Sequence, residues 1–222
     1  MCAARGATST KSDICSDLTH RRGGLTAALR AGTSRLHREA ERSGVIAELL
    51  AGRAGLADYL ALLGNLLPVY ETMEAPDAPH QVRCLVPSAL FRAGAIRTDL
   101  AARCTAPVAL SPEGAAYAAS VAASGKRMVA HAYARYLGDL SGGRVLARLV
   151  PGLAFHSFPQ SLDLAAAKAA FRAEIDRIGE DMQDWSALVE EARAAFRHNI
   201  AISRAVSAAG GETARSMSPG RR

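Results

Sequence analysis

No convincing stretch of this chain alternates apolar and polar residues with the period of two that marks a β-strand. Alanine is abundant and β-branched residues are sparse, and both features favour helices. The chain has 222 residues, of which 49% are hydrophobic and 22% charged, so it is large enough to bury one core. The sequence therefore predicts an all-α protein with a single globular domain.

Helices are predicted where apolar or small residues recur at spacings of three and four, or where capping residues mark an end. Ser111 followed by Pro112 is typical of a helix start, whereas Pro151 with Gly152 ends a helix. Pro68 predicts a kink. The predicted helices are Leu25–Ser43, Leu56–Met73, Ser88–Arg103, one from Ser111 through Tyr117, Lys126–Val150, Leu162–Gly179 and Trp185–Ala208, with loops at Ala75–Pro87 and Pro151–Gln160.

The two ends of the chain differ in composition from the rest. The first two dozen residues lack the apolar core of a secretory signal, and the final segment SAAGGETARSMSPGRR has turn formers without an apolar period. We therefore expect a disordered N-terminal tail at 1–24, a domain at 25–206 and a flexible C-terminal tail at 207–222. No segment approaches about 18 uninterrupted apolar residues, so we expect a soluble protein without a membrane span.

Cysteine spacing and net charge narrow the possible partners. The four cysteines form no CxxC or CxxCH motif, which disfavours a zinc site, a redox pair and covalent c-type haem, and fits a reducing cytoplasm. The net charge of +6 suits an acidic protein partner, a nucleic acid or an anionic ligand. Arginines are spread along the chain rather than clustered, so we expect no nucleic-acid binding, although a basic nucleic-acid module stays an alternative.

The segment YLGDLSGGR places three glycines inside a predicted helix, although each costs roughly 1 kcal/mol relative to alanine. Gly138 and Gly142 are four residues apart and share one helical face, with Gly143 beside them. Such a face suits either close packing of another helix or a flat ligand that reaches the backbone. Asp139 favours the ligand, because a carboxylate in apolar surroundings is costly to bury unless it holds water or another hydrogen-bonding partner.

The longer segment AHAYARYLGDLSGGR resembles the distal-helix signature of haem oxygenases, and the resemblance extends from about Leu25 to Ala205. It implies a multi-helix fold in which haem is sandwiched between a proximal and a distal helix. The distal helix would turn Gly138, Gly142 and Gly143 toward the ring.

The resemblance also implies that His37, in LRAGTSRLHREAE, is the proximal ligand of the haem iron. Glu41, one turn onward, would bind the other ring nitrogen and select its tautomer. Without the resemblance, a single helical histidine is more often a structural or surface residue, and Glu41 an ordinary surface glutamate.

Haem carries two propionates, and the resemblance implies a clamp that binds them through Arg30, Lys168, Arg172 and Tyr133. Lys168 and Arg172 are four apart on one predicted helix. Arg30 stands where the family often has lysine, which keeps the charge and changes the geometry. Each of these cations could instead be an ordinary solvated charge.

A water network beside bound oxygen is a further implication of the resemblance. The residues at the matching positions are Asp139, Tyr70, Tyr117, Arg135 and Asn199. Phe196 would pack near the ring. Core packing alone is the alternative for the tyrosines and for Phe196.

The implied activity is oxidative cleavage of haem to biliverdin, carbon monoxide and free iron, with O2 as the oxidant. Haem would be both substrate and prosthetic group, and electrons would come from a ferredoxin or an NADPH-dependent reductase. The protein would act as a monomer. Side chains at Gly138 or Gly142 would occupy the place of the oxygen, whereas Asp139 would order the water that supplies protons.

Other functions stay open on the sequence alone. A haem carrier or sensor with the same fold would bind haem without degrading it. A thiaminase-like or di-iron enzyme is disfavoured, because the inward Glu-x-x-His pairs of a di-iron site are missing. Two more histidines lie near these segments. We expect His131 to make a structural hydrogen bond. His156 lies in the LAFHSFP loop, at a position where members of the family have different residues.

Overall fold

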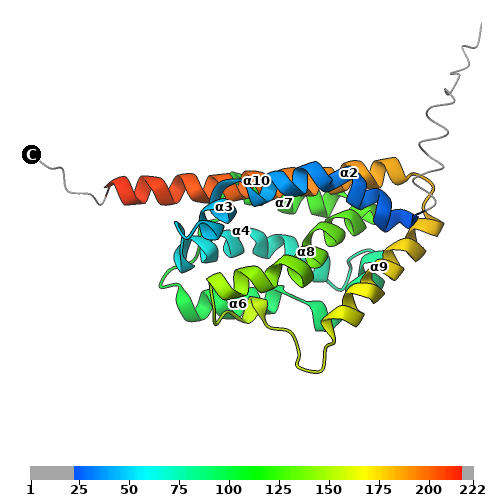
Figure 1. Cartoon of the computed structure of the whole chain (residues 1–222), viewed down its shortest axis with the longest axis horizontal. Helices are drawn as coiled ribbons and strands as arrows, with labels where there is room; N and C mark the ends of the chain where they lie inside the picture. The colour runs from blue at the N-terminus through cyan, green and yellow to red at the C-terminus, as the bar shows by residue number, and fades with distance from the viewer. Residues whose placement is uncertain (1–22, 217–222) are drawn as a thin grey trace, which may run out of the picture.

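The computed structural model describes residues 23–216, so most of the predicted N-terminal tail and residues 217–222 lie outside the described residues. Within this range every regular element is helical, which confirms the predicted all-α fold. The elements are α2 (Gly24–Glu41), α3 (Gly44–Leu50), α4 (Leu56–Glu74), α5 (His80–Leu85), the 3-10 turn η1 (Ser88–Leu90), α6 (Ala93–Arg103), α7 (Pro112–Ala123), η2 (Gly125–Arg127), α8 (Met128–Leu149), η3 (Ala154–His156), α9 (Leu164–Asp181) and α10 (Trp185–Ser216) (Figure 1).

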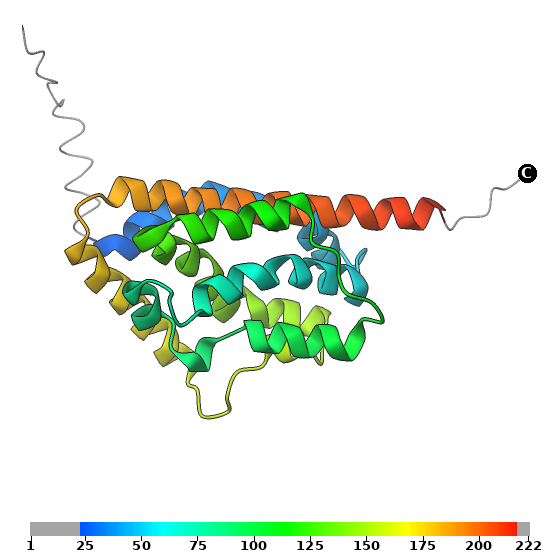
Figure 2. The ribbon, with the colours of Figure 1, turned by 180° about the vertical axis from the view of Figure 1, so that it is seen from behind.

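The long helix α10 organises the fold. It packs against α2, α3, α4, α7 and α8. Figure 1 shows α2 lying along α10, and Figure 2, seen from behind, shows α7 along it as well. Helix α8 passes below them and α9 closes one end of the molecule, where it packs against α2 and α8 (Figure 1).

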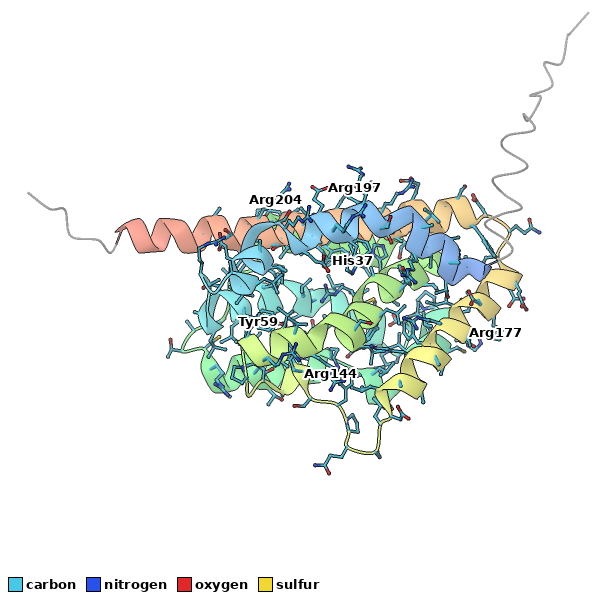
Figure 3. The ribbon with its side chains drawn as sticks, viewed as in Figure 1. His37, Tyr59, Arg144, Arg177, Arg197 and Arg204 are labelled. Carbon is cyan, nitrogen blue, oxygen red and sulfur yellow. The ribbon has the colours of Figure 1, made fainter. Side chains whose placement is uncertain are left out.

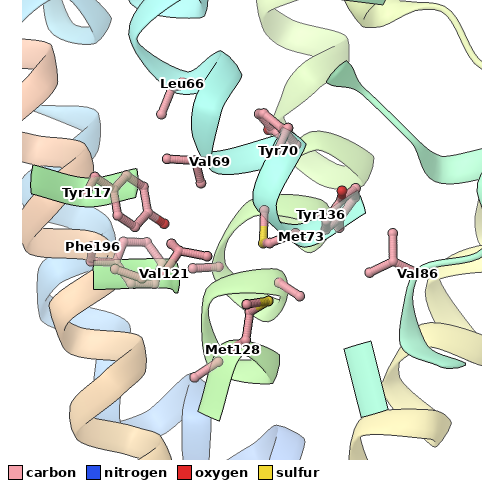
Figure 4. Packing of buried hydrophobic residues seen from close by; sticks show 14 of the residues in the cluster. Leu66, Val69, Tyr70, Met73, Val86, Tyr117, Val121, Met128, Tyr136 and Phe196 are labelled. Atoms are coloured by element: carbon pink, nitrogen blue, oxygen red, sulfur yellow. The ribbon is translucent and has the colours of Figure 1, made fainter. Parts of the chain in front are cut away.

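Buried side chains of α4, α7 and α8 fill the centre of the molecule (Figure 4). Tyr70 of α4 packs edge-on against Tyr136 of α8, with ring centroids 5.6 Å apart. Met73, Tyr117 and Val121 are buried around them. Because full burial of an apolar side chain of this size contributes roughly 1.5–3 kcal/mol, this cluster holds α4, α7 and α8 together.

The predicted start of α7 is confirmed. Ser111 is the N-cap, its hydroxyl accepts a 3.1 Å hydrogen bond from the Gly114 amide, and Pro112 occupies the first turn. Pro68 lies inside α4 without ending it. Local capping chemistry thus set this start as expected.

Helix α3 was not predicted from the sequence; it begins at Gly44, directly after the predicted end of the first helix. Gly44 has a φ of +52°, and a Cβ there would collide with the backbone of Ser203 in α10. Ser203 also accepts from the Ile46 amide at 3.2 Å and donates to the Ser43 carbonyl at 2.9 Å. Packing against α10 therefore stabilises a helix that is too short to form alone.

The predicted loop at Ala75–Pro87 is interrupted by α5, which is a second correction. Val82 and Leu85 of α5 are buried, so tertiary contacts stabilise this short helix.

The helix predicted over Ser88–Arg103 begins only at Ala93, because Glu74 caps it there. The Glu74 carboxylate accepts hydrogen bonds from the Arg92 amide at 2.6 Å and from the Ala93 amide at 3.1 Å. A carboxylate from the end of α4 thus satisfies the free amides of the first turn of α6.

The last helix was predicted to end at Ala208, but α10 continues to Ser216, so this part of the predicted C-terminal tail is helical. The extension still contacts the rest of the fold, because a Cβ on Gly210 would lie 3.0 Å from Asp58 Oδ1 of α4. Just before it, the Ser207 hydroxyl donates a 2.6 Å hydrogen bond to Glu48 of α3. None of the helices in the described range combines the length and apolar character needed to cross a bilayer.

Candidate active site

Four of the predicted site residues, from three helices, form one hydrogen-bond network. The Tyr70 hydroxyl donates to Asp139 at 2.6 Å and accepts from Arg135 Nε and Nη2 at 3.0 and 2.7 Å. Arg135 also donates to Asn199 Oδ1 at 2.9 Å and lies 3.5 Å from the Asp139 carboxylate. Helices α4, α8 and α10 therefore converge at this network.

The network is almost enclosed, since the side chains of Arg135 and Asp139 are only 15% and 10% exposed. Burial raises the pKa of Asp139 above its usual value, although Arg135 and the Tyr70 hydrogen bond lower it. Burial also raises the pKa of Tyr70, which keeps its proton and stays a donor. Burial lowers the pKa of Arg135, but Tyr70 and Asp139 more than offset this, so its guanidinium stays charged. The site thus has a carboxyl that exchanges protons more readily than an exposed aspartate.

The glycine face of α8 is open. A Cβ built on Gly138 or Gly142 meets no other atom within 4 Å, and both residues are exposed. No helix of the described chain packs on these two positions, so the helix-packing interpretation of the glycines is wrong here. At Gly143 a Cβ would lie 3.8 Å from His156 Nδ1.

Tyr117 is buried next to the network. Burial raises its pKa, although Arg135 and Asn199 lie close enough for both to lower it. Its hydroxyl makes no hydrogen bond with any described residue. Its ring stacks instead on His198 of α10, with centroids 5.0 Å apart and planes 8° from parallel. A buried hydroxyl without a protein partner is the kind of group that an ordered water satisfies.

His37, the predicted iron ligand, lies on α2, outside the hydrogen-bond network. Its side chain is 56% exposed. Its Nδ1 is 3.4 Å from the Glu41 carboxylate, one turn onward. Because Glu41 engages Nδ1, Nε2 is the nitrogen left for a metal. The pairing of His37 with Glu41 is the one predicted from their spacing.

Helix α10 links the two halves of the site. Phe196 and Asn199 are one turn apart on it and point to the same side. Phe196 packs against His37 with ring centroids 5.6 Å apart, whereas Asn199 accepts from Arg135. Figure 3 shows His37 between α2 and the part of the molecule that contains α8. The histidine and the buried network therefore border one region, with α10 as its wall.

The predicted cations gather where α2, α8 and α9 meet. Arg30 and Arg172 both lie near enough to Tyr133 to lower its pKa, although burial raises it overall. Lys168 is half-buried one turn before Arg172 on α9. Within residues 23–210 none of the three cations forms an ion pair with a carboxylate, which leaves them for an anionic group.

Hydrogen bonds that join α2 to α9 support this arrangement of the cations. The Thr26 amide donates to Asp176 at 2.7 Å, and the Thr26 hydroxyl donates to the Arg172 carbonyl at 3.1 Å.

His131 has the structural role that the sequence predicted. Its Nε2 lies 2.9 Å from Glu191 of α10, and its side chain is fully buried. Glu191 also accepts from Arg127 at 2.8 Å. Burial lowers the pKa of His131 although Glu191 raises it, so the imidazole is neutral at neutral pH.

Two residues that were not predicted from the sequence, Arg92 and Asp99, hold the loop between α8 and α9. Buried Arg92 donates from Nη1 to the carbonyls of Phe155 and Ser157 at 2.9 and 2.8 Å. Asp99 accepts from the amides of Ala154 and Phe155 at 2.7 and 2.8 Å. Asp99 is on α6 and Arg92 is the residue just before it. No local pattern marks either side chain as buried, so only the packing of α6 against η3 could identify them.

The described residues contain no group of three or more His, Cys, Asp or Glu side chains that could hold a metal ion.

The chain is similar in sequence to known proteins of one family. The family model described as heme oxygenase matches residues 23–205. Heme oxygenase 1 of Nostoc sp. is 32% identical over 197 residues, which cover 79% of this chain and 83% of that protein. Human heme oxygenase 1 is 27% identical over 201 residues, which cover 80% of this chain and 70% of that protein.

Solved structures agree with the sequence matches. The crystal structure of heme oxygenase-1 from the cyanobacterium Synechocystis sp. in complex with heme has a TM-score of 0.72 and 30% identity, covering 88% of this chain and 100% of that one. Heme oxygenase from Leptospira interrogans has a TM-score of 0.73 and 26% identity, covering 82% of this chain and 99% of that one.

Proposed function

Because the chain belongs to the haem oxygenase family, we propose that it cleaves haem oxidatively to biliverdin, carbon monoxide and free iron. O2 would be the oxidant, and an electron-donor protein would supply the reducing equivalents. The observation that carries this proposal is the buried network of Tyr70, Arg135 and Asp139 beside the open glycine face of α8.

The described residues fit a haem as ligand. The backbone at Gly138 and Gly142 is accessible, because even a Cβ there would meet no protein atom within 4 Å. His37 offers an exposed imidazole on α2, and Phe196 adds an aromatic ring beside it. The unpaired cations near Tyr133 suit the two propionates of a haem.

Bound haem would supply an iron that binds O2 and a porphyrin ring that is itself oxidised. The chain would supply the rest. The Gly138 and Gly142 backbone would let the ring and its oxygen lie close to α8, where larger side chains would exclude them. Asp139, with its raised pKa, would order water and pass protons, while Tyr70 and Arg135 hold its carboxylate in place.

A haem carrier or sensor with the same fold is the second candidate, and the network argues against it. Binding requires a histidine and cations for the propionates, but it does not require a buried carboxylate. Burying Asp139 with Arg135 costs desolvation energy that their attraction offsets only in part. A chain that only stored haem would gain stability by losing this pair.

The decisive experiment adds hemin to the full-length protein, records the Soret band, then supplies a reductant in air and identifies the bile pigment by chromatography. We expect biliverdin from the wild type. Asp139→Asn should still bind hemin but should lose biliverdin formation by about a hundredfold. Asp181→Asn, which changes a 78% exposed aspartate on α9, is the matched control and should behave as wild type.

A wild type that binds hemin and yields no bile pigment would support the carrier and overturn the proposed activity. Normal biliverdin yield from Asp139→Asn would remove Asp139 from its assigned role.

We further propose that the electron donor is an acidic ferredoxin or flavoprotein reductase that docks on the arginine-rich face of α2 and α10. A groove on this face is lined mainly by arginines. Its lining residues are Arg35, Arg38, Glu39, Arg42, Ser43 and Arg204. Figure 3 shows Arg197 and Arg204 on this face, near the helix that carries His37. Complementary charge would steer an acidic donor toward the haem edge.

Charge reversal tests the donor proposal. Arg38→Glu combined with Arg42→Glu should slow turnover at least tenfold with an acidic donor protein and leave turnover with ascorbate unchanged. Arg83→Glu, on α5, is the control. Equal loss with both reductants would show damage to the haem site rather than to docking.

We also propose that the protein works as a monomer in the cytoplasm. Cys84 and Cys104 are free thiols, as a reducing compartment would keep them. Light scattering on the hemin complex tests the monomer, and a stable dimer would contradict it.

A further inference from the structure

His156 brings an imidazole to the edge of the glycine face. It is the last residue of η3, which is held in place by Asp99 of α6 and by Arg92, the residue just before α6. Its ring stacks on Tyr59 of α4, with centroids 5.5 Å apart and planes 8° from parallel. Its Nδ1 lies 3.8 Å from where a Cβ on Gly143 would be. The network described above does not include this imidazole.

A cavity of about 30 Å³ lies between His156 and the buried carboxylate of Asp139. Its lining residues are Asp139, Leu140, Gly143, Arg144, Phe155, His156, Phe158 and Leu164. A space of this size holds one or two water molecules. Most of its lining is apolar, and the side chains that could hydrogen-bond a water there are those of Asp139, Arg144 and His156.

The surroundings of the ring favour one tautomer of His156. Nε2 is buried and has no hydrogen-bond partner among the described residues. A buried N–H without an acceptor costs more than a buried nitrogen lone pair without a donor. The proton therefore belongs on Nδ1, the nitrogen on the Gly143 side. Burial also lowers the pKa of His156, while Asp99 raises it and Arg92 lowers it, so the ring is neutral at neutral pH.

Asp139 has acceptor capacity to spare. Its Oδ2 accepts from Tyr70, and its Oδ1 lies 3.5 Å from Arg135. An ionised carboxylate offers about four lone-pair sites, so another donor can be accommodated.

We propose that His156 is a positioning residue: its Nδ1–H holds a water in this cavity, and that water donates to the Asp139 carboxylate. The water contact itself is inferred from the geometry. Its use in the reaction, as a second proton source beside Asp139, rests on the proposed function. Tyr59 fixes the plane of the ring, and Arg92 and Asp99 fix the loop that carries it.

The first test uses the full-length protein without haem. Nitrogen-15 NMR of His156 should report the Nδ1–H tautomer at neutral pH, and the Nε2–H tautomer would overturn the proposal. Carbon-13 NMR of the carboxyls then follows Asp139. His156→Phe should raise the pKa of Asp139 by about half a unit to one unit, because a donor to its charged form is lost.

The matched variant is His156→Asn, whose amide nitrogen replaces Nδ1. It should return the pKa of Asp139 to within about 0.3 units of wild type. If His156 only packs, the pKa of Asp139 will be the same in wild type and in both variants, and that result would overturn the proposal.

The second test loads hemin. His156→Phe should bind hemin as the wild type does and form biliverdin three- to tenfold more slowly, with His156→Asn close to wild type. Equal rates in all three proteins would overturn the role of His156. If the wild type itself forms no biliverdin, the proposed function fails, while the NMR titration still decides the water contact.

Discussion

The hydroxyl of Tyr70 donates a 2.6 Å hydrogen bond to the carboxylate of Asp139, across 69 residues of sequence. This bond joins α4 to the glycine-bearing helix α8 at the point where Arg135 also reaches both groups. A buried carboxylate is stable only with such partners. The bond therefore serves the fold and, in the proposed reaction, the orientation of the proton-exchanging group.

Tyr70→Phe should weaken both functions. It removes the donor to Asp139 and the acceptor of Arg135, so we expect a loss of about 1–3 kcal/mol in the free energy of unfolding, and biliverdin formation at least tenfold slower. Urea unfolding and chromatographic product assays measure the two effects. Tyr136→Phe is the control, because that buried hydroxyl donates to Glu74 at 2.8 Å, so it should cost similar stability with little loss of rate.

Gly138→Ala should stabilise the haem-free protein and weaken its binding of hemin. The added Cβ meets no atom within 4 Å, so the helix gains up to about 1 kcal/mol, or about 2–4 °C in Tm. The same methyl group would occupy space that the ligand needs. Thermal melts and hemin titrations should thus change in opposite senses.

The control for this prediction is Gly179→Ala. Its Cβ would lie 2.6 Å from the Leu25 Cβ, so this variant should lose stability. Unchanged hemin affinity in Gly138→Ala would contradict contact between the glycine face and the ligand.

His37→Ala should leave the haem-free fold intact and lower hemin affinity. The side chain is 56% exposed, so the free energy of unfolding should change by no more than about 0.5 kcal/mol. The Soret spectrum should lose the features of an imidazole ligand, and added imidazole should restore them. Arg38→Ala, the exposed neighbour, is the control, and identical spectra for both variants would exclude His37 as the ligand.

His131 should make the protein less stable in mild acid. Burial lowers the pKa of His131 in the folded protein below the value of 6.5 expected in the unfolded chain. Above pH 6.5 the imidazole is neutral in both the folded and the unfolded protein, so the free energy of unfolding is at its full value. As the pH falls below 6.5 the unfolded state binds the proton first, and up to about 1.4 kcal/mol is lost per pH unit. Urea unfolding from pH 7 to pH 5 measures this loss.

His131→Gln keeps a donor for Glu191 and should have a shallower pH dependence than wild type. Asp139 and Glu74, whose pKa values are raised, contribute the opposite slope in both proteins, so the difference between the two isolates His131. Parallel curves would show that His131 does not carry this effect.

Sequence patterns correctly predicted those structural features that depend only on residues within one helical turn of each other. The helical class, the Ser111 cap and the His37–Glu41 pair all follow from spacings of three or four residues. The resemblance in the glycine-bearing segment extended this to Tyr70 and Asn199, which no local pattern would have connected to Asp139.

The packing of the helices decided the rest. Glu74 sets where α6 begins, Ser203 and Glu48 hold the short helix α3 against α10, and η3 carries His156 to the side of Gly143. These contacts join residues far apart in the chain, so they depend on which buried faces meet. Hydrogen bonds within one turn are encoded locally, whereas burial and long-range partners exist only once the core has formed.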